Sequence, residues 1–222
     1  MLEQIKETAA WIKAHTALQP QTAIILGTGL GHLAEEIETV DEFPYQDIPN
    51  FPVSTVEGHS GKLIFGRLGG KEVMALQGRF HYYEGYNMKQ VTFPIRVMYE
   101  LGIKNLFVSN ASGGMNPDFK IGDLMLITDH INFMPEHPLH GPNFPTGPRF
   151  PDMHEAYDHE FLDMARTIAK EKGIRTFGIS IITDLGVEGK IVEVSHEEVQ
   201  KAANEVQPLM ADIFREMIRR IG

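Results

Sequence analysis

Short runs of apolar residues alternate along the chain with longer stretches in which apolar residues recur at a helical period. Residues 3–16 are of the second kind, because Ile5, Ala9 and Ile12 fall on or near one face of a helix. Residues 22–26 are of the first kind, a continuous apolar run that is typical of a buried strand. The order in which these two kinds of segment follow one another predicts the fold.

The apolar runs predict strands at residues 22–26, 62–66, 71–76, 105–108, 124–127 and 176–183, with a hairpin at Gly69-Gly70. Helices are predicted at residues 3–16, 88–101, 161–172 and 197–221, with a short one ending near Ile37. Residues 41–60 and 135–152 are rich in Pro or Gly and are expected to be irregular. Strands and helices in this order predict an α/β fold in one domain, residues 1–222. Its central sheet, mixed or largely parallel, is expected to be flanked by helices.

Composition limits the classes of function. The 222 residues include 20 Lys and Arg against 30 Asp and Glu, a net charge of −10. This balance argues against a nucleic-acid partner, because phosphate backbones need a basic surface. The absence of Cys excludes disulfides, thiolate catalysis and Cys-ligated zinc. No apolar run is long enough to cross a membrane, and residues 1–4 do not begin a signal peptide, so we expect a cytoplasmic protein.

The densest group of polar and aromatic residues lies at residues 78–86, directly after an apolar run. It contains Arg79, His81 and Tyr83 and is closed by Gly85. Arg offers a rigid fork of donors that suits phosphate, His can donate to the same anion, and an aromatic ring can cover a sugar or a base. A surface loop with aromatic anchors is the alternative interpretation of this segment.

Two further strand ends are rich in glycine. Residues 27–31, which contain Thr28, and residues 110–114, which contain Asn110 and Ala111, each follow an apolar run. Glycine lets backbone N–H groups approach an anion, and ligands of open α/β sheets bind at the carboxyl ends of strands. Each turn alone is also explained as a tight connection between two elements. Together with the Arg and His of residues 78–86, the two turns could surround one phosphate.

Three residues outside these motifs are weaker candidates. His59 lies in a loop between glycines and could join the phosphate ligands, although a loop His is more often an ordinary surface residue. Asp184 follows an apolar strand and could bond a heterocycle nitrogen or simply cap the strand end. His196 begins a predicted helix, where a local capping contact competes with a contact to a substrate hydroxyl. The other His residues have no metal-ligand spacing, so no metal site is predicted.

Taken together, these motifs resemble purine nucleoside phosphorylases of the trimeric, 6-oxopurine-preferring type. The matching segments cover nearly the whole chain in order: residues 27–31, 56–61, 77–86, 110–117, 141–143, 149–151 and 195–199. The Gly-Arg-Phe-His-x-Tyr-Glu-Gly element at residues 78–85 is highly specific. The resemblance implies a nucleoside phosphorylase-like fold. It also implies reversible phosphorolysis of purine ribonucleosides or 2'-deoxyribonucleosides to a free purine and (2-deoxy)ribose 1-phosphate, in purine salvage.

The resemblance also assigns roles to single residues. Phosphate would be held by Thr28, His59, Arg79, His81 and the backbone N–H of Ala111. The nucleoside would be contacted by Tyr83, Asn110, Phe150, Asp184 and His196. Catalytic roles fall to His81, Asp184 and His196. Phe150 would reach the sugar site of a neighbouring subunit, which implies a homotrimer. Phosphate is a co-substrate, and neither a metal nor an organic cofactor is implied.

Two departures from the family pattern stand out. The family has a further block after the helix that ends near Lys172, with a Glu that grips the purine and a Ser that helps to bind phosphate. This chain instead runs through residues 173–175 directly into Thr176, so several dozen residues are expected to be missing. Asp184 stands where many members have Asn, and an ionised carboxylate only accepts hydrogen bonds. Asp184 is therefore expected to favour a 6-amino purine more than an Asn side chain would. The sequence leaves the preferred base open.

Other functions remain possible at this point. A 5'-methylthioadenosine phosphorylase is the nearest alternative, although the Tyr-rich segment and His196 suit a free 5'-hydroxyl better. A catalytically impaired remnant that keeps the fold is a second, because part of the base site is expected to be missing. A dinucleotide-dependent oxidoreductase is a distant third, since His32 occupies the third glycine position of the G-x-G-x-x-G fingerprint.

Overall fold

A computed structural model describes residues 1–27, 30–53, 61–144, 147–172, 180–185 and 196–221, without the side chains of Asp184 and His196. Its first sheet has five strands, β1 (Thr22–Leu26), β2 (Glu38–Pro44), β3 (Lys62–Leu68), β4 (Lys71–Gln77) and β5 (Asn105–Val108), in the order β2-β3-β4-β1-β5. The second sheet contains β6 (Asn110–Gly114), β7 (Leu124–Met125) and β8 (Ser180–Leu185), in the order β6-β8-β7. The predicted α/β fold with a mixed central sheet is confirmed.

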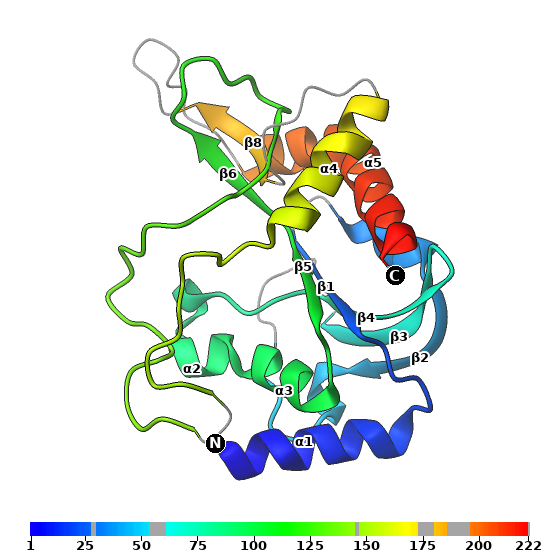
Figure 1. Cartoon of the computed structure of the whole chain (residues 1–222), viewed down its shortest axis with the longest axis vertical. Coiled ribbons are helices and arrows are strands. Elements are labelled where there is room, and N and C mark those ends of the chain that lie inside the picture. Colours follow the sequence, from blue (N-terminus) through cyan, green and yellow to red (C-terminus); the bar gives the residue numbers. More distant parts are fainter. Residues whose placement is uncertain (28–29, 54–60, 145–146, 173–179, 186–195, 222) are drawn as a thin grey trace.

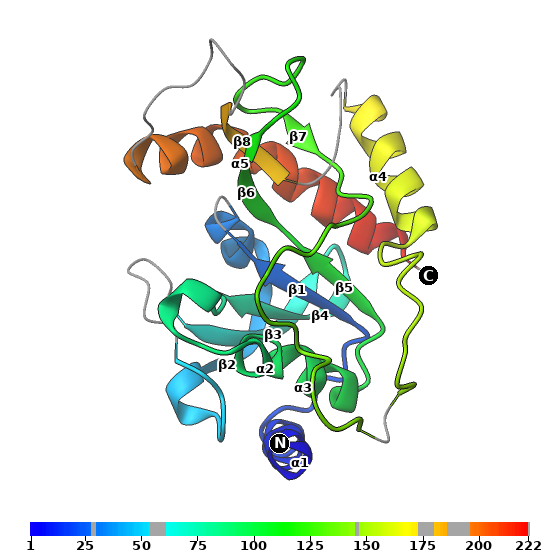
Figure 2. The same ribbon diagram turned by 90° about the vertical axis from the view of Figure 1, so that its left-hand side faces the viewer.

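The helices lie on both sides of the five-stranded sheet (Figure 1). In that view α1 (Leu2–His15), α2 (Met88–Val91) and α3 (Phe93–Leu101) lie below the sheet, and α4 (His159–Glu171) and α5 (His196–Arg220) lie above it. Figure 2 shows the same two groups from the side. Short 3-10 helices occur at η1 (Gly31–Glu36), η2 (Tyr45–Asp47) and η3 (Tyr82–Glu84).

Alternating side chains of the central strands explain these two layers. On β4, Val73 and Ala75 belong to the apolar cluster that includes α4 and α5, whereas Met74 and Leu76 belong to the cluster with α1 and α3. Successive residues of a strand point to opposite faces. A strand that is apolar at every position therefore fits only between two covering layers, as the continuous apolar runs predicted.

Several local predictions are confirmed by the structure. β3 and β4 form the predicted antiparallel hairpin, whose turn is Gly69-Gly70 with φ of 59° and 79°. Such φ values suit a type I′ turn and favour glycine at both positions. Gly102 ends α3 in the left-handed region, with φ of 93°. Within the described residues, no helix combines the length and apolar character needed to span a membrane.

Other local predictions were wrong or incomplete. The single helix expected at residues 88–101 is broken at Thr92, because Pro94 follows and lacks the backbone N–H of a helix interior. Residues 41–44, expected to be irregular, belong to β2, an edge strand that tolerates Pro44 at its last position. The turn expected at residues 110–114 is itself the strand β6. Residues 176–179 and the proposed cap Ser195 lie outside the described residues.

The direction of the central strands brings three chain segments together. β1 pairs in parallel with both β4 and β5, so the carboxyl ends of these three strands lie at one edge of the sheet. Gly27, Gly78 and Ser109 are the residues that directly follow these ends. The candidate site is built on this edge, as expected for an open α/β sheet.

Candidate functional site

Arg79 is delivered to the sheet edge by a turn that follows β4. Gly78 has φ of 102°, a conformation that favours glycine, and this turns the chain away from the strand. The hydroxyl of buried Tyr45 donates a hydrogen bond of 2.7 Å to the Gly78 carbonyl. Phe80 is buried against the Tyr45 ring, with 5.2 Å between the ring centroids. Packing on both sides of Arg79 therefore fixes the backbone from which its side chain extends.

The guanidinium of Arg79 is largely withdrawn from water. Its Nη1 donates to the Ser109 carbonyl oxygen over 2.6 Å, and its Nε is buried without a hydrogen-bond acceptor in the described part of the chain. Burial lowers the pKa of Arg79 from its ordinary value. No described carboxylate forms an ion pair with it. A buried cation without a carboxylate is costly, and a bound anion would compensate its charge.

Gly27 and Ser109 close the site from the ends of β1 and β5. The Gly27 N–H donates to the Ser109 hydroxyl over 3.1 Å. A Cβ atom at Gly27 would lie 2.2 Å from the Ser109 carbonyl oxygen and 2.8 Å from Arg79 Nη1. Only glycine therefore permits this approach of the three segments. The structure places Gly27, the first residue of the 27–31 segment, directly against Arg79.

His81 and Tyr83 form the aromatic part of the 78–86 segment. Their rings stack at 4.7 Å between centroids with an interplanar angle of 18°. The His81 N–H donates to Glu84 Oε1 over 2.7 Å, and Gly85 ends η3 with φ of 93°. Tyr83 is 75% exposed. These residues follow Arg79 directly in the chain and offer an imidazole and a solvent-accessible aromatic ring to a ligand.

The second glycine-rich segment lies on β6, which continues from Ser109. Asn110 and Ala111 are half-buried, and Asn110 Nδ2 donates to the Ala111 carbonyl over 3.4 Å. β6 pairs in parallel with β8 in a register that places Asp184 opposite Gly113. The backbone of Asp184 is therefore brought to the strand that carries Asn110 and Ala111.

The remaining predicted residues are placed only in part. Thr28 and His59 lie outside the described residues. His196 is the first residue of α5, but its side chain is not described. Phe150 is 87% exposed, and its neighbours Arg149 and Pro151 line a cavity with α1 and α3 rather than with Arg79. The structure thus does not bring Phe150 to the phosphate candidates of its own chain.

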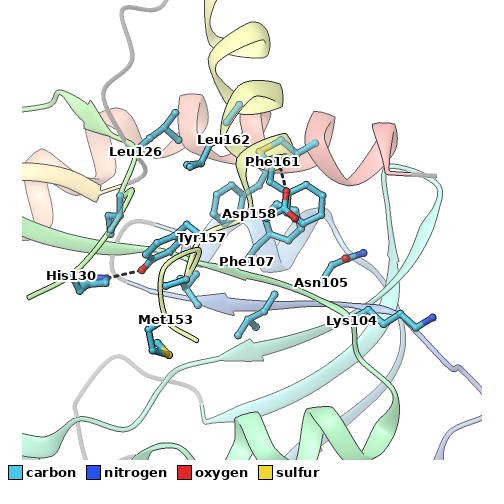
Figure 3. A pocket seen from close by; sticks show the side chains of 17 residues that line it. Lys104, Asn105, Phe107, Leu126, His130, Met153, Tyr157, Asp158, Phe161 and Leu162 are labelled. Atoms are coloured by element: carbon cyan, nitrogen blue, oxygen red, sulfur yellow. Dashed lines mark hydrogen bonds between the residues drawn. The ribbon is translucent and has the colours of Figure 1, made fainter. Parts of the chain in front are cut away.

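A separate cavity of about 570 Å³ lies beside β5 and is shown in Figure 3. Its walls come from β5, from α4 and from α5, and they are mainly apolar, including Phe107, Phe161 and Leu162. One of the hydrogen bonds drawn there joins His130 Nε2 and the Tyr157 hydroxyl over 2.6 Å. None of Gly27, Arg79 or Ser109 lines this cavity, so it is distinct from the candidate phosphate site.

Two residues at the site were not predicted from the sequence. Ser109 and Tyr45 hold the glycine turn and the Arg79 turn, respectively. Ser109 stands directly after an apolar run and before the glycine-rich segment, and that position was the available signal. Tyr45 gave no signal, because it is a single aromatic residue in a segment expected to be irregular.

Comparison with known proteins shows the family of this chain. The sequence pattern of the phosphorylase superfamily matches residues 21–177. The chain belongs to this superfamily. It is 55% identical over 175 residues to purine nucleoside phosphorylase 1 of Bacillus subtilis, and 49% identical over 175 residues to the mouse purine nucleoside phosphorylase. These matches cover 78% and 77% of this chain, but only 65% and 61% of the two relatives.

Solved structures give the same family. The chain superposes on Schistosoma mansoni purine nucleoside phosphorylase in complex with adenosine with a TM-score of 0.90 and 34% identity, over 99% of this chain and 98% of that one. The complex of the Schistosoma mansoni enzyme with inosine gives a TM-score of 0.89 and 33% identity, over 99% and 97%. The resemblance to purine nucleoside phosphorylases and the nucleoside phosphorylase fold are confirmed. The shorter chain is consistent with the predicted missing segment.

Proposed function

We propose that this chain is a purine nucleoside phosphorylase, a pentosyltransferase that cleaves purine nucleosides with inorganic phosphate and needs no other cofactor. The observation that carries the proposal is Arg79, a half-buried residue whose guanidinium Nε is buried and has no acceptor in the described residues. It lies against Gly27 and Ser109 at the carboxyl ends of three strands. A phosphate there would accept hydrogen bonds from the guanidinium and neutralise its charge.

The proposed reaction exchanges one bond at the sugar for another. The bond between C1' and the purine nitrogen breaks, its electron pair goes to the purine, and a phosphate oxygen forms the new bond to C1'. The sugar passes through a cationic, oxocarbenium-like state. Phosphate held by Arg79 beneath C1' stabilises this cation and then captures it. A proton delivered at the purine N7 completes the leaving group.

The residues beyond phosphate have proposed roles that follow the family resemblance. His81 assists Arg79 at the phosphate, and Tyr83 and His196 contact the ribose. Asn110 contacts the nucleoside, and Asp184 faces the purine. The register of β6 and β8 supports this arrangement, because it sets Asp184 opposite Gly113 on the strand that carries Asn110. Thr28 and His59 are proposed as further phosphate ligands from the sequence alone.

We propose a homotrimer as the assembled form. Phe150 is largely exposed in the single chain, and so are Ile131 and Phe133 in the same irregular region. A protein interface would bury such apolar side chains. In a trimer, Phe150 would complete the sugar site of the neighbouring subunit, which explains its distance from the phosphate candidates of its own chain.

The decisive experiment incubates the purified 222-residue chain with inosine, with and without phosphate, and follows the release of hypoxanthine. Phosphate-dependent release is the expected result. Arg79→Gln is expected to reduce the rate by about 100-fold or more, because it removes a charge aimed at the reacting phosphate. Arg67→Gln is the matched control, since Arg67 is half-exposed on β3 and pairs only weakly with Glu72 at 3.9 Å. Equal rates for Arg79→Gln and the unsubstituted chain would contradict the proposal.

A second candidate is supported by the length of the chain. It spans about two thirds or less of the curated relatives it matches, and the family's absent block would hold part of the base site. A protein that binds phosphate but does not turn over nucleosides fits that observation. Calorimetry with phosphate, combined with the hypoxanthine assay, separates the two, since phosphate binding without hypoxanthine release would favour this second candidate.

A further inference from the structure

Ser109 occupies the single position between β5 and β6, where the chain passes from one sheet to the other. It is 2% exposed, and both of its acceptor groups are used. Its hydroxyl oxygen accepts the Gly27 N–H over 3.1 Å, and its carbonyl oxygen accepts Arg79 Nη1 over 2.6 Å. One residue therefore connects the glycine turn after β1 with the guanidinium after β4.

Gly27, the Ser109 carbonyl and the Arg79 guanidinium are packed closely together. The position of a Cβ at Gly27 is only 2.2 Å from the Ser109 carbonyl oxygen and 2.8 Å from Arg79 Nη1. Gly27 is buried, so its N–H would have no water to donate to if the Ser109 hydroxyl were removed. Loss of that hydroxyl would let the glycine turn shift, and the turn rests directly against the guanidinium.

We infer that Ser109 is a positioning residue for phosphate, which sets the distance between Gly27 and the Arg79 guanidinium. The inference rests on the proposed function and adds to it a residue that itself needs no contact with the substrate. A shift of Gly27 would change the packing against Arg79 Nη1. In the proposed site phosphate accepts hydrogen bonds from this guanidinium, so phosphate affinity should depend on the Ser109 hydroxyl more than nucleoside affinity does.

The test compares Ser109→Ala with Ser109→Thr in the full chain. We expect Ser109→Ala to weaken inorganic phosphate binding about five-fold in calorimetry, the effect of one lost hydrogen bond. The KM for phosphate should rise by a similar factor, while the KM for inosine stays within about two-fold. Ser109→Thr keeps the hydroxyl and should restore phosphate binding. Ser109→Cys serves as a second variant if the alanine variant does not fold, because the thiol keeps the shape but accepts hydrogen bonds weakly.

Thr22→Val is the matched control. The Thr22 hydroxyl accepts a hydrogen bond from Asn105 Nδ2 over 3.4 Å, so it joins the same two strands, β1 and β5, at their opposite end. Thr22→Val should lower the melting temperature without changing phosphate affinity. Equal phosphate affinity of Ser109→Ala and the unsubstituted chain would overturn the inference alone. An unsubstituted chain that binds no phosphate would overturn the proposed function, and the inference with it.

Discussion

The Tyr45 hydroxyl donates to the Gly78 carbonyl over 2.7 Å, and this bond ties the segment after β2 to the turn that precedes Arg79. Tyr45 is 1% exposed and packs against Phe51 and Phe80 at 5.3 and 5.2 Å between ring centroids. An aromatic cluster on the α1 and α3 side of the sheet thus positions the residue that carries the candidate phosphate site. We therefore propose that this relationship links the stability of the core to the affinity for phosphate.

Tyr45→Phe should reveal that link. The variant leaves the Gly78 carbonyl without its donor, so we expect the free energy of unfolding to fall by about 1 kcal/mol and the phosphate affinity to fall about two- to three-fold. Thermal melts and calorimetry measure the two effects. Tyr157→Phe is the control, because it loses the 2.6 Å bond to His130 in the cavity beside β5. A control that weakened phosphate binding equally would contradict the link.

Burial of Tyr45 also makes the stability of the protein depend on pH. It raises the pKa of the phenol above the ordinary value of 10.0, so the folded protein keeps Tyr45 protonated where the unfolded chain would ionise it. The associated stability is fully present below pH 10 and is lost as the pH rises above that value. We expect the unsubstituted chain to lose stability more steeply above about pH 10 than Tyr45→Phe does. Chemical unfolding at pH 9 and pH 11 measures this difference.

Gly27→Ala should disrupt the site through crowding. A Cβ at that position meets backbone oxygen at 2.2 Å, a distance that requires the strand ends to separate. We expect a cost of about 2 kcal/mol in the free energy of unfolding and loss of measurable phosphate binding. Gly31→Ala is the control within the same glycine-rich segment, since a Cβ at Gly31 meets nothing within 4 Å. Equal phosphate binding of Gly27→Ala and Gly31→Ala would argue against the close approach.

The outer edge of β5 is expected to promote association between chains. β5 pairs with β1 on one side only within the described residues, and Leu106 and Val108 are 38% and 37% exposed. An apolar edge strand is a template for unwanted pairing, which charged residues oppose. Leu106→Lys should therefore reduce aggregation in light scattering at equal concentration. Val40→Lys, an equally charged change on the opposite edge strand β2, is expected to have little effect.

The end of α5 should contribute to the loss of stability at low pH. Hydrogen bonds from Arg219 and Arg220 lower the pKa of Glu216 from 4.5 to about 2. A depressed pKa contributes stability above pH 4.5 that is lost as the pH falls from that value to about 2. Glu216→Gln should remove this part of the pH dependence. The melting temperature at pH 6 and pH 3 measures it, with Glu3→Gln on α1 as the control, and an unchanged difference between the two pH values would contradict the assignment.

Asp184 should influence which base is preferred. Its carboxylate only accepts hydrogen bonds when ionised, whereas the amide of Asn both donates and accepts. Asp184→Asn is therefore expected to raise the rate with inosine relative to the rate with adenosine. Steady-state assays with both nucleosides test this, and the same rate ratio before and after substitution would count against a role at the base.

The sequence by itself determined the candidate chemistry and most elements. The 78–86 segment and the two glycine-rich segments were recognisable because their residue types together suit an anion and a nucleoside. The strands of the central sheet were predictable from continuous apolar runs, since a strand covered on both faces has no polar positions. The break at Thr92 was also encoded, in Pro94, although periodicity alone hid it.

Only the tertiary structure decided what holds the site together. The bond from Gly27 to Ser109 joins residues 82 positions apart, and the bond from Tyr45 to Gly78 joins residues 33 apart. Such pairs form when parallel strands bring their ends to one edge, and no local pattern specifies them. β6 shows the same effect, because its Asn-Ala-Ser-Gly-Gly sequence has little intrinsic preference for a strand, yet pairing with β8 makes it one. Sequence supplied the groups that can bind phosphate, and long-range pairing set their distances.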